Sequence, residues 1–478
     1  MKREKHASIL ADNKMGSMSI SKLLFSMALP LAISMLVQAF YNVVDCLFVS
    51  MVSESAVTAL SLAFSVQNLQ IGFATGIAVG MNSLLSKSLG ERNQARANRT
   101  AGNAILLMGI VTLLFMLFGA FGTKAYYGLF NISAETMQNS CDYTAICSIF
   151  TLGLFVEILG ERLLQASGKT LFTLFSQGSG AVINIILDPL FILGSEGISA
   201  KFGIQLPFYM PAYGVTGAAI ATVIGQCSAG VMAVIFNLKF NSDIQFSLKD
   251  LKPDATVLKK ILAVGIPSII MMAIGSVMNL LMNQIFLGFQ DVGETASAVF
   301  GVYFKLQSFF LMPLFGINNA AISIIAYNYG ARQPGRITKT LKLSLISAMV
   351  IMLTGVLLFQ LIPEQLMGIF SSNQESGSGM FLSLGVSALR IVSLHFPLAA
   401  VGIALGASFQ ALGNGIYSTI TSLCRQLIAL VPAAFLLSLT GDIHAVWWSF
   451  PIAEIVSMTL SLIFYSRIYK EKVKPMYN

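Results

Sequence analysis

The chain has 478 residues, of which 55% are hydrophobic and only 10% are charged. Soluble proteins carry about 25% charged residues, so this composition excludes a soluble protein. It also excludes a disordered one, because disorder requires low hydrophobicity. The formal net charge of +8 is attributed to basic loops that face anionic lipid, and no nucleic-acid partner is expected. The composition predicts an all-α polytopic membrane protein in contact with the lipid bilayer.

Twelve apolar stretches are long enough to cross a bilayer as helices, for which about 20 residues suffice. The stretches are continuous and do not alternate between polar and apolar residues, which excludes a membrane β-barrel. They cover residues 22–49, 57–82, 99–122, 140–163, 169–194, 211–237, 258–287, 296–327, 341–362, 380–409, 416–439 and 445–468.

Basic residues are distributed unevenly between the two sides of the predicted membrane. Of the 29 Lys and Arg residues, 24 lie in the tails and in the loops on the side of the N-terminus. Only Lys124 and Lys201 lie on the other side, and three fall within spans. Because basic loops stay in the cytoplasm, both termini are predicted to be cytoplasmic in a multi-pass protein of the cell membrane. The first 22 residues are basic and lack a cleavable apolar core, so no signal peptide is expected.

The two halves of the sequence resemble each other. "LGERNQARANRT" at 89–100 aligns with "YGARQPGRITKT" at 329–340, and "LLQASGKT" at 163–170 aligns with "SFQALGNG" at 408–415. Six spans per half predict two pseudo-symmetric six-helix lobes related by an axis along the membrane normal. The expected parts are a cytoplasmic tail (1–21), an N-lobe (22–237), a cytoplasmic linker (238–257), a C-lobe (258–468) and a second cytoplasmic tail (469–478).

Two acidic residues of the first half, Asp45 and Asp188, lie within predicted spans. A charge at the centre of a bilayer costs at least about 2.5–3.5 kcal/mol, so such residues are by default functional. The repeat aligns them with Met282 and Ala433. Since the second half packs without these acids, the scaffold does not require them, and we expect that they have a function in one lobe.

Polar residues near these acids have the spacing of helix faces. Gln38, Tyr41, Asn42 and Asp45 lie at i, i+3, i+4 and i+7, and Asn184 precedes Asp188 by one turn. Thr222 is a further candidate oxygen ligand. Carboxylates, amides and a hydroxyl suit one proton or a small hard cation such as Na⁺ at Asp45, Asn184 and Asp188, and burial favours protonation of at least one acid. The alternatives are that each acid pairs with a Lys or Arg, and that Gln38, Tyr41, Asn42 and Thr222 make ordinary hydrogen bonds.

Other buried charges are harder to interpret. Glu157, Glu161 and Arg162 lie near the cytoplasmic end of the fourth span, where a gate or a structural pair is expected. The second half contains Lys305, Arg390, His395, Arg425 and Glu454, whose partners the sequence does not reveal. No P-loop, Ser/His/Asp arrangement or HExxH motif is present, so neither an enzyme nor a resident cofactor or metal is expected.

Several short motifs resemble those of the MATE (multidrug and toxic compound extrusion) family. They are "YNVVDCLFV" in the first span, "INIILDPLFI" in the fifth, "GAAIATV" in the sixth and "AYNYGARQPGR" after the eighth. The pattern is nearest to the DinF-like branch, with its MepA-type multidrug export proteins. The resemblance implies two six-helix lobes, alternating access, a functional monomer, and export of amphipathic, often cationic drugs against inward H⁺ or Na⁺. It places the cation site at Asp45, Asn184, Asp188 and Thr222, with Gln38 and Tyr41 nearby.

One departure and two alternatives remain. The NorM-like branch places an acid in the seventh span, but "GIPSIIMMAIGSVMN" has none, so the cation site is expected in the N-lobe. A lipid or lipid-linked saccharide flippase of the same wider superfamily would need a cationic cavity, and only Lys305, Arg390 and Arg425 are basic residues within spans. A channel or receptor would give ion flux or signalling without gradient-driven export.

Overall fold

The structure is a computed structural model of the whole chain. It describes residues 13–130, 132–245, 247–290, 292–371 and 378–477, apart from the side chains of Asn42, Glu54, Ser371 and Ser378. The described residues form helices and contain no strand. The predicted all-α class is therefore confirmed. Most of the expected N-terminal tail lies outside the described residues.

The chain forms two compact units. Of the described residues, the first unit comprises residue 13 and those within 33–265, and the second comprises those within 14–32 and 266–477. The division falls within two long helices, close to Pro30 and Pro267, and the linker belongs to the first unit. The lobe boundaries expected from the sequence stay a prediction.

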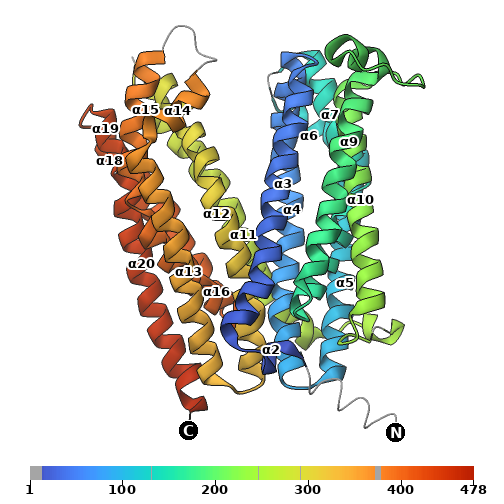
Figure 1. Cartoon of the computed structure of the whole chain (residues 1–478), viewed down its shortest axis with the longest axis vertical. Helices are drawn as coiled ribbons and strands as arrows, with labels where there is room; N and C mark the ends of the chain where they lie inside the picture. The colour runs from blue at the N-terminus through green and yellow to red at the C-terminus, as the bar shows by residue number, and fades with distance from the viewer. Residues whose placement is uncertain (1–12, 131, 246, 291, 372–377, 478) are drawn as a thin grey trace. The chain divides into compact units, whose positions relative to one another are not determined.

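The first unit consists of long helices that pack through small residues. In Figure 1, α9 and α10 run side by side in green and yellow-green, and α10 also packs against α8. The elements are α3 (Ile20–Ser50, first-unit residues from 33), α4 (Glu54–Gly90), α5 (Gln94–Leu117), the π-helical turn η1 (Phe118–Gly122), α6 (Thr123–Tyr127), α7 (Ala134–Ile149), α8 (Leu152–Ala166), α9 (Thr170–Phe202), α10 (Gly214–Phe240) and η2 (Leu248–Leu251).

The second unit has a core rich in aromatic rings. The rings of Phe286 and Trp447 lie 4.6 Å apart between centroids, and Phe286 also contacts Phe300 at 5.1 Å. The elements are α2 (Lys14–Ser17), α11 (Ala255–Leu287, second-unit residues from 266), α12 (Gly293–Gly330), α13 (Pro334–Leu361), α14 (Pro363–Ser371), α15 (Ser378–Ser393), α16 (Phe396–Ala411), α17 (Gly415–Leu423), η3 (Cys424–Leu430), α18 (Val431–Ser438), α19 (Ile443–Trp447), α20 (Ser449–Ile468), η4 (Tyr469–Val473) and η5 (Lys474–Met476).

The described helices account for the twelve predicted spans. Ten helices are long and apolar enough to cross a membrane, and two bent pairs complete the twelve if each pair is one span. The pairs are α7–α8, bent by 48°, and α15–α16, bent by 49°. The stretches 140–163 and 380–409 are thus broken rather than continuous helices. In the second pair, Pro397 lies at the start of α16 and has no N–H to continue the helical hydrogen bonds.

Backbone geometry supports the internal repeat. Arg92 and Arg332, which the sequence aligns, are the two non-glycine residues with positive φ among the described residues, at 54° and 53°. Each directly follows the C-terminal cap of a long helix, α4 or α12. A left-handed arginine is costly, so its recurrence at aligned positions indicates that the two halves make the same turn.

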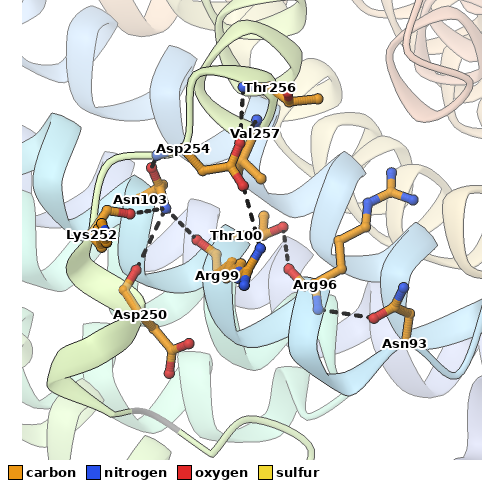
Figure 2. Close-up of polar contacts among 10 residues, drawn as sticks. All are labelled: Asn93, Arg96, Arg99, Thr100, Asn103, Asp250, Lys252, Asp254, Thr256 and Val257. Atoms are coloured by element: carbon orange, nitrogen blue, oxygen red, sulfur yellow. Dashed lines mark hydrogen bonds and ion pairs between the residues drawn. The ribbon is translucent and has the colours of Figure 1, made fainter.

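The linker after α10 is bound to the first unit by Asn103 of α5 (Figure 2). The Asn103 side chain is fully buried and accepts a hydrogen bond from the Asp254 backbone N–H at 2.8 Å. Its amide nitrogen donates to the carbonyl oxygens of Lys252, at 3.3 Å, and Asp250, at 3.5 Å. Asp254 in turn caps α11 by accepting from the N–H groups of Thr256 and Val257. This part of the linker is therefore more ordered than its polar composition indicates.

In the second unit, Arg336 binds the segment that begins with α2. Its Nη2 donates to the carbonyl oxygens of Met15 and Met18, both at 2.8 Å. Its Nε donates to Asn328 Oδ1 at 2.9 Å, and Asn328 Nδ2 donates to the Met15 carbonyl at 3.2 Å. The segment Lys14–Ala32 therefore has polar as well as apolar contacts with the second unit.

Candidate functional site

The two membrane-depth acids both lie in the first unit. Asp45 of α3 is 8% exposed, and Asp188 of α9 is fully buried. Their carboxylates interact electrostatically. Neither takes part in an ion pair among the described residues, whose pairs all involve other acids. The alternative in which each acid is held by a permanent Lys or Arg therefore has no support in the described chain.

Three buried oxygen atoms of these residues have no hydrogen-bond partner among the described residues: Asp45 Oδ1, Asn184 Oδ1 and Asp188 Oδ2. Thr222 Oγ1 is also buried and makes no hydrogen bond of full geometry, but it interacts with the Tyr143 hydroxyl. The one hydrogen bond within this set runs from Asn184 Nδ2 to Asp188 Oδ1 at 3.1 Å. A buried polar atom without a partner costs about 1–3 kcal/mol. Oxygen atoms alone, two of them from carboxylates, suit a proton or a hard cation.

A small cavity lies beside these residues, where α3, α8, α9 and α10 meet. The volume that the centre of a water molecule can occupy in this cavity is about 20 Å³. This is enough for one or two waters or a small ion. Tyr41, Glu157, Asn184 and Thr222 line it, whereas Asp45 and Asp188 do not. The remaining lining residues are Gln177, Gly180, Ala181, Gly225 and Gln226.

The close approach of α9 and α10 depends on glycines. A Cβ atom at Gly180 would lie 2.7 Å from the carbonyl oxygen of Gly225, and one at Gly225 would lie 3.1 Å from Asn184 Cβ. Real Cβ atoms do not approach a backbone oxygen this closely. The two glycines therefore allow the contact that places Asn184 of α9 and Thr222 of α10 on one cavity wall.

Beyond the site, α9 changes direction at a glycine. The helix continues through Pro189 and is interrupted at Gly194, which has φ 67° and ψ 179°. The Phe191 carbonyl nearby accepts a hydrogen bond from Tyr213 N–H at 2.8 Å. The proline that follows Asp188 thus precedes an irregular turn in which α9 is bound to the start of α10.

The remaining predicted site residues have different surroundings. Gln38 is half-buried in α3 and does not line the cavity. Asn42 lies in α3, but its side chain is outside the described residues. Gln38 is therefore not brought to the cavity, although it belongs to the same predicted helix face as Tyr41.

The predicted cytoplasmic gate does not form an ion pair among the described residues. Arg162 Nη1 donates to Gln165 Oε1 at 3.0 Å, and Glu161 Oε1 is buried without a hydrogen-bond partner in the described chain. Glu157 instead lines the small cavity together with Tyr41. The structure thus places Glu157 next to the predicted cation site, whereas the gate role of all three residues stays a prediction.

Two polar cavity residues, Gln177 and Gln226, were not predicted from the sequence. Gln177 lies seven residues before Asn184, and Gln226 lies four residues after Thr222. Both spacings put a side chain on the same helix face as a predicted ligand. Helical spacing applied outward from Asn184 and Thr222 would therefore have found both glutamines.

Comparisons with known proteins agree with this arrangement. The sequence model of the MatE family matches residues 30–190 and 267–436, more than half of the chain. The multidrug export protein MepA of Staphylococcus haemolyticus (strain JCSC1435) is 25% identical over 452 residues, which cover 93% of each chain. MepA of Staphylococcus aureus (strain N315) is 24% identical over 451 residues, covering 93% of this chain and 94% of the relative.

Solved structures show the same fold. A crystal structure of MATE in complex with MaL6 is similar with a TM-score of 0.88 and 22% identity, covering 96% of this chain and 99% of that chain. A multidrug resistance MATE family transporter of the MOP superfamily in an outward-facing conformation has a TM-score of 0.86 and 22% identity, covering 97% of this chain and 98% of that one.

Proposed function

The chain belongs to the MatE family of multidrug efflux transporters, and we propose that it is a cation-coupled antiporter that exports amphipathic, often cationic drugs by alternating access. Inward movement of H⁺ or Na⁺ drives the export. The protein acts in the cell membrane as a monomer with both termini cytoplasmic, and it needs no resident cofactor. The multidrug export proteins that it resembles over 93% of their length support the substrate class.

The observation that carries the proposal is the set of three partnerless buried oxygens at Asp45, Asn184 and Asp188. Two carboxylates that repel each other without a basic neighbour are stabilised by any cation that binds between their helices. A proton on one carboxylate gives these oxygens a hydrogen to share in a hydrogen bond. A Na⁺ ion instead binds to the oxygens as its ligands. Binding and release of such a cation is the step that an antiporter needs.

Coupling follows if the cation changes the packing of the helices that supply its ligands. The ligands come from α3, α9 and α10, and α3 and α9 each contain a proline, Pro30 and Pro189. A helix with a proline has a missing hydrogen bond at which it bends. A cation that draws Asp45 and Asp188 together therefore favours one bend of these helices over another, and drug affinity changes with it.

The test is drug efflux from proteoliposomes in which either a pH gradient or a Na⁺ gradient is imposed. Wild-type protein is expected to export drug with at least one gradient, and Asp188→Asn is expected to lose gradient-dependent export while it still binds drug. Asp142→Asn, a substitution of the same kind at an acid of α7 that accepts from Gln138, is the matched control. Gradient-driven export by Asp188→Asn at the wild-type rate would refute the coupling role.

The flippase alternative gains no support from the second unit. A pyrophosphate site needs several converging cations. Lys305 and Arg390 are exposed, and neither lines the cavity of the second unit that Arg425 lines. A single arginine is not the group of converging cations that a pyrophosphate needs.

A further inference from the structure

A second, larger cavity lies within the second unit, between α12, α16, η3 and α20. The volume that the centre of a water molecule can occupy in this cavity is about 170 Å³. It is comparable to engineered protein cavities of about 150 Å³ that bind benzene. Its wall combines aromatic rings, among them Phe304 and Phe450, with the polar side chains of Tyr303, His395 and Arg425. A cavity of this size and lining is suited to one or two aromatic rings with a polar group.

The ion pair between Arg425 and Glu454 in this cavity uses only one N–H group of the arginine. Arg425 Nη1 lies 3.4 Å from Glu454 Oε1, and this is the one hydrogen bond of the Arg425 side chain to a described residue. The Glu454 side chain is 5% exposed, whereas that of Arg425 is 32% exposed. A guanidinium has five N–H donors in a planar fork that binds a carboxylate through two parallel hydrogen bonds. Arg425 therefore keeps most of its donors for another acceptor.

Local backbone geometry sets Arg425 apart from an ordinary helical residue. It lies in η3, a π-helical turn inserted between α17 and α18. Such single π-turns are rare and occur frequently at functional sites.

His395 adds a polar ring to the cavity. Its Nδ1 lies 3.0 Å from the Val392 carbonyl oxygen, which accepts but cannot donate, so Nδ1 carries a proton. Its Nε2 lies 3.4 Å from Gln307 Nε2. Both ring nitrogens are thus engaged by the protein, whereas Arg425 keeps unused donors and is the cation available to a ligand.

A second polar group lies beside Arg425. Tyr303 is 1% exposed and lines the cavity. Its hydroxyl group interacts with the side chain of Gln307 but makes no hydrogen bond of full geometry. Because a phenol hydroxyl both donates and accepts, Tyr303 can turn its O–H group to a ligand in the same cavity as Arg425.

We propose that this cavity binds aromatic ligands that carry a carboxylate. The carboxylate pairs with the free N–H groups of Arg425 and accepts from the Tyr303 hydroxyl, while the ring packs against Phe304 and Phe450. Glu454 is the internal competitor, because it occupies part of Arg425 when the ligand is absent. The site goes beyond the proposed cation coupling: it lies in the other unit, and its selectivity for a negative group is opposite to that of Asp45 and Asp188.

The test is equilibrium binding of 2-naphthoate to the purified full-length protein in lipid nanodiscs, measured by isothermal titration calorimetry with empty nanodiscs as the blank. The matched ligand is the neutral 2-naphthamide. We expect the amide to bind about tenfold more weakly than the carboxylate, because it loses the charge-assisted hydrogen bonds to Arg425. The same loss is expected for 2-naphthoate with Arg425→Gln.

The variant Glu454→Gln is expected to raise the affinity for 2-naphthoate, whereas Arg425→Gln lowers it. Removing the competing carboxylate frees Arg425, so 2-naphthoate is expected to bind about threefold or more tightly to this variant. Arg390→Gln, at an exposed arginine of α15 that does not line the cavity, is the control and should bind like the wild type. These measurements require no transport, so they are independent of whether export is coupled to a cation.

The proposal is overturned if the amide binds as tightly as the carboxylate, if Arg425→Gln retains wild-type affinity, or if Glu454→Gln weakens binding. Absence of binding to the wild type would overturn it as well. Should Arg425→Gln not give folded protein, the ligand pair on the wild type and the gain in Glu454→Gln decide the question.

Discussion

Gly168 and Gly413 have the same left-handed backbone, with φ of 77° at both residues. Each follows the end of a helix, and each forms the same pair of closing hydrogen bonds. Gly168 N–H donates to Gln165 O at 2.9 Å and Lys169 N–H to Leu164 O at 2.7 Å. The corresponding bonds in the second unit run from Gly413 to Gln410 and from Asn414 to Phe409. Both are Schellman caps, so the repeat extends to the hydrogen bonds that end α8 and α16.

These caps give the first prediction. Gly168→Ala and Gly413→Ala should each lower stability by about 1 kcal/mol or more, because a Cβ atom disfavours positive φ. Thermal unfolding in detergent measures the effect. Gly178→Ala is the control, since a Cβ at this helical position of α9 meets no atom within 4 Å, and it should be neutral or stabilising. Equal losses at all three positions would show that the φ angle is not the cause.

The second prediction concerns Asp45. Asp45→Asn should reduce drug efflux from proteoliposomes about tenfold or more while the midpoint of thermal unfolding stays the same or rises. The physical reason is that no described basic residue depends on this carboxylate. If Asp45 neutralised a buried cation, its removal would cost about 3–5 kcal/mol. A large drop in the unfolding midpoint would therefore favour a structural role.

The third prediction concerns the contact between α9 and α10. Gly225→Ala places a Cβ 2.9 Å from the Gly180 carbonyl oxygen and 3.1 Å from Asn184 Cβ. We expect a loss of about 1–3 kcal/mol from overpacking, together with impaired efflux because Asn184 is displaced from Asp188. Thermal unfolding and efflux are measured on the same preparation. Wild-type behaviour in both would mean that the two helices do not need this close approach.

The fourth prediction concerns the linker. A Cβ at Gly102 would lie 2.1 Å from the Asp250 carbonyl oxygen, so Gly102→Ala should detach the linker from α5. Trypsin should then cleave faster after Lys249, as followed by limited proteolysis and mass spectrometry. Gly109→Ala, on the same helix with no atom within 4 Å of the added Cβ, should be cleaved at the wild-type rate. Unchanged cleavage in Gly102→Ala would contradict the docking.

The sequence predicted the spans well because long apolar stretches carry a strong signal. It did not predict the breaks before Leu152 and Phe396, since a bent pair of short helices has the same hydropathy as one straight helix. Asp45 and Asp188 were identifiable because a carboxylate in an apolar stretch is costly. Gln177 and Gln226 share helix faces with Asn184 and Thr222 but were not singled out, because uncharged amides are common in membrane helices.

The second-unit cavity could not be predicted from the sequence either. Its polar residues come from α12, η3 and α20 and from the junction between α15 and α16. The pairing of Arg425 with Glu454 depends on how these helices pack. The sequence contains the charged residues but not the single contact that leaves most of the guanidinium available.

The binding of Arg336 to the carbonyl oxygens of Met15 and Met18 has a practical consequence for handling the protein. An affinity tag fused ahead of Lys14 leaves both acceptors in place. A truncation that begins after Met18 would deprive a half-buried guanidinium of two of its three acceptors, leaving Asn328 alone to hold it. Shortened versions intended for crystallisation should therefore retain this stretch, although it precedes the first long helix.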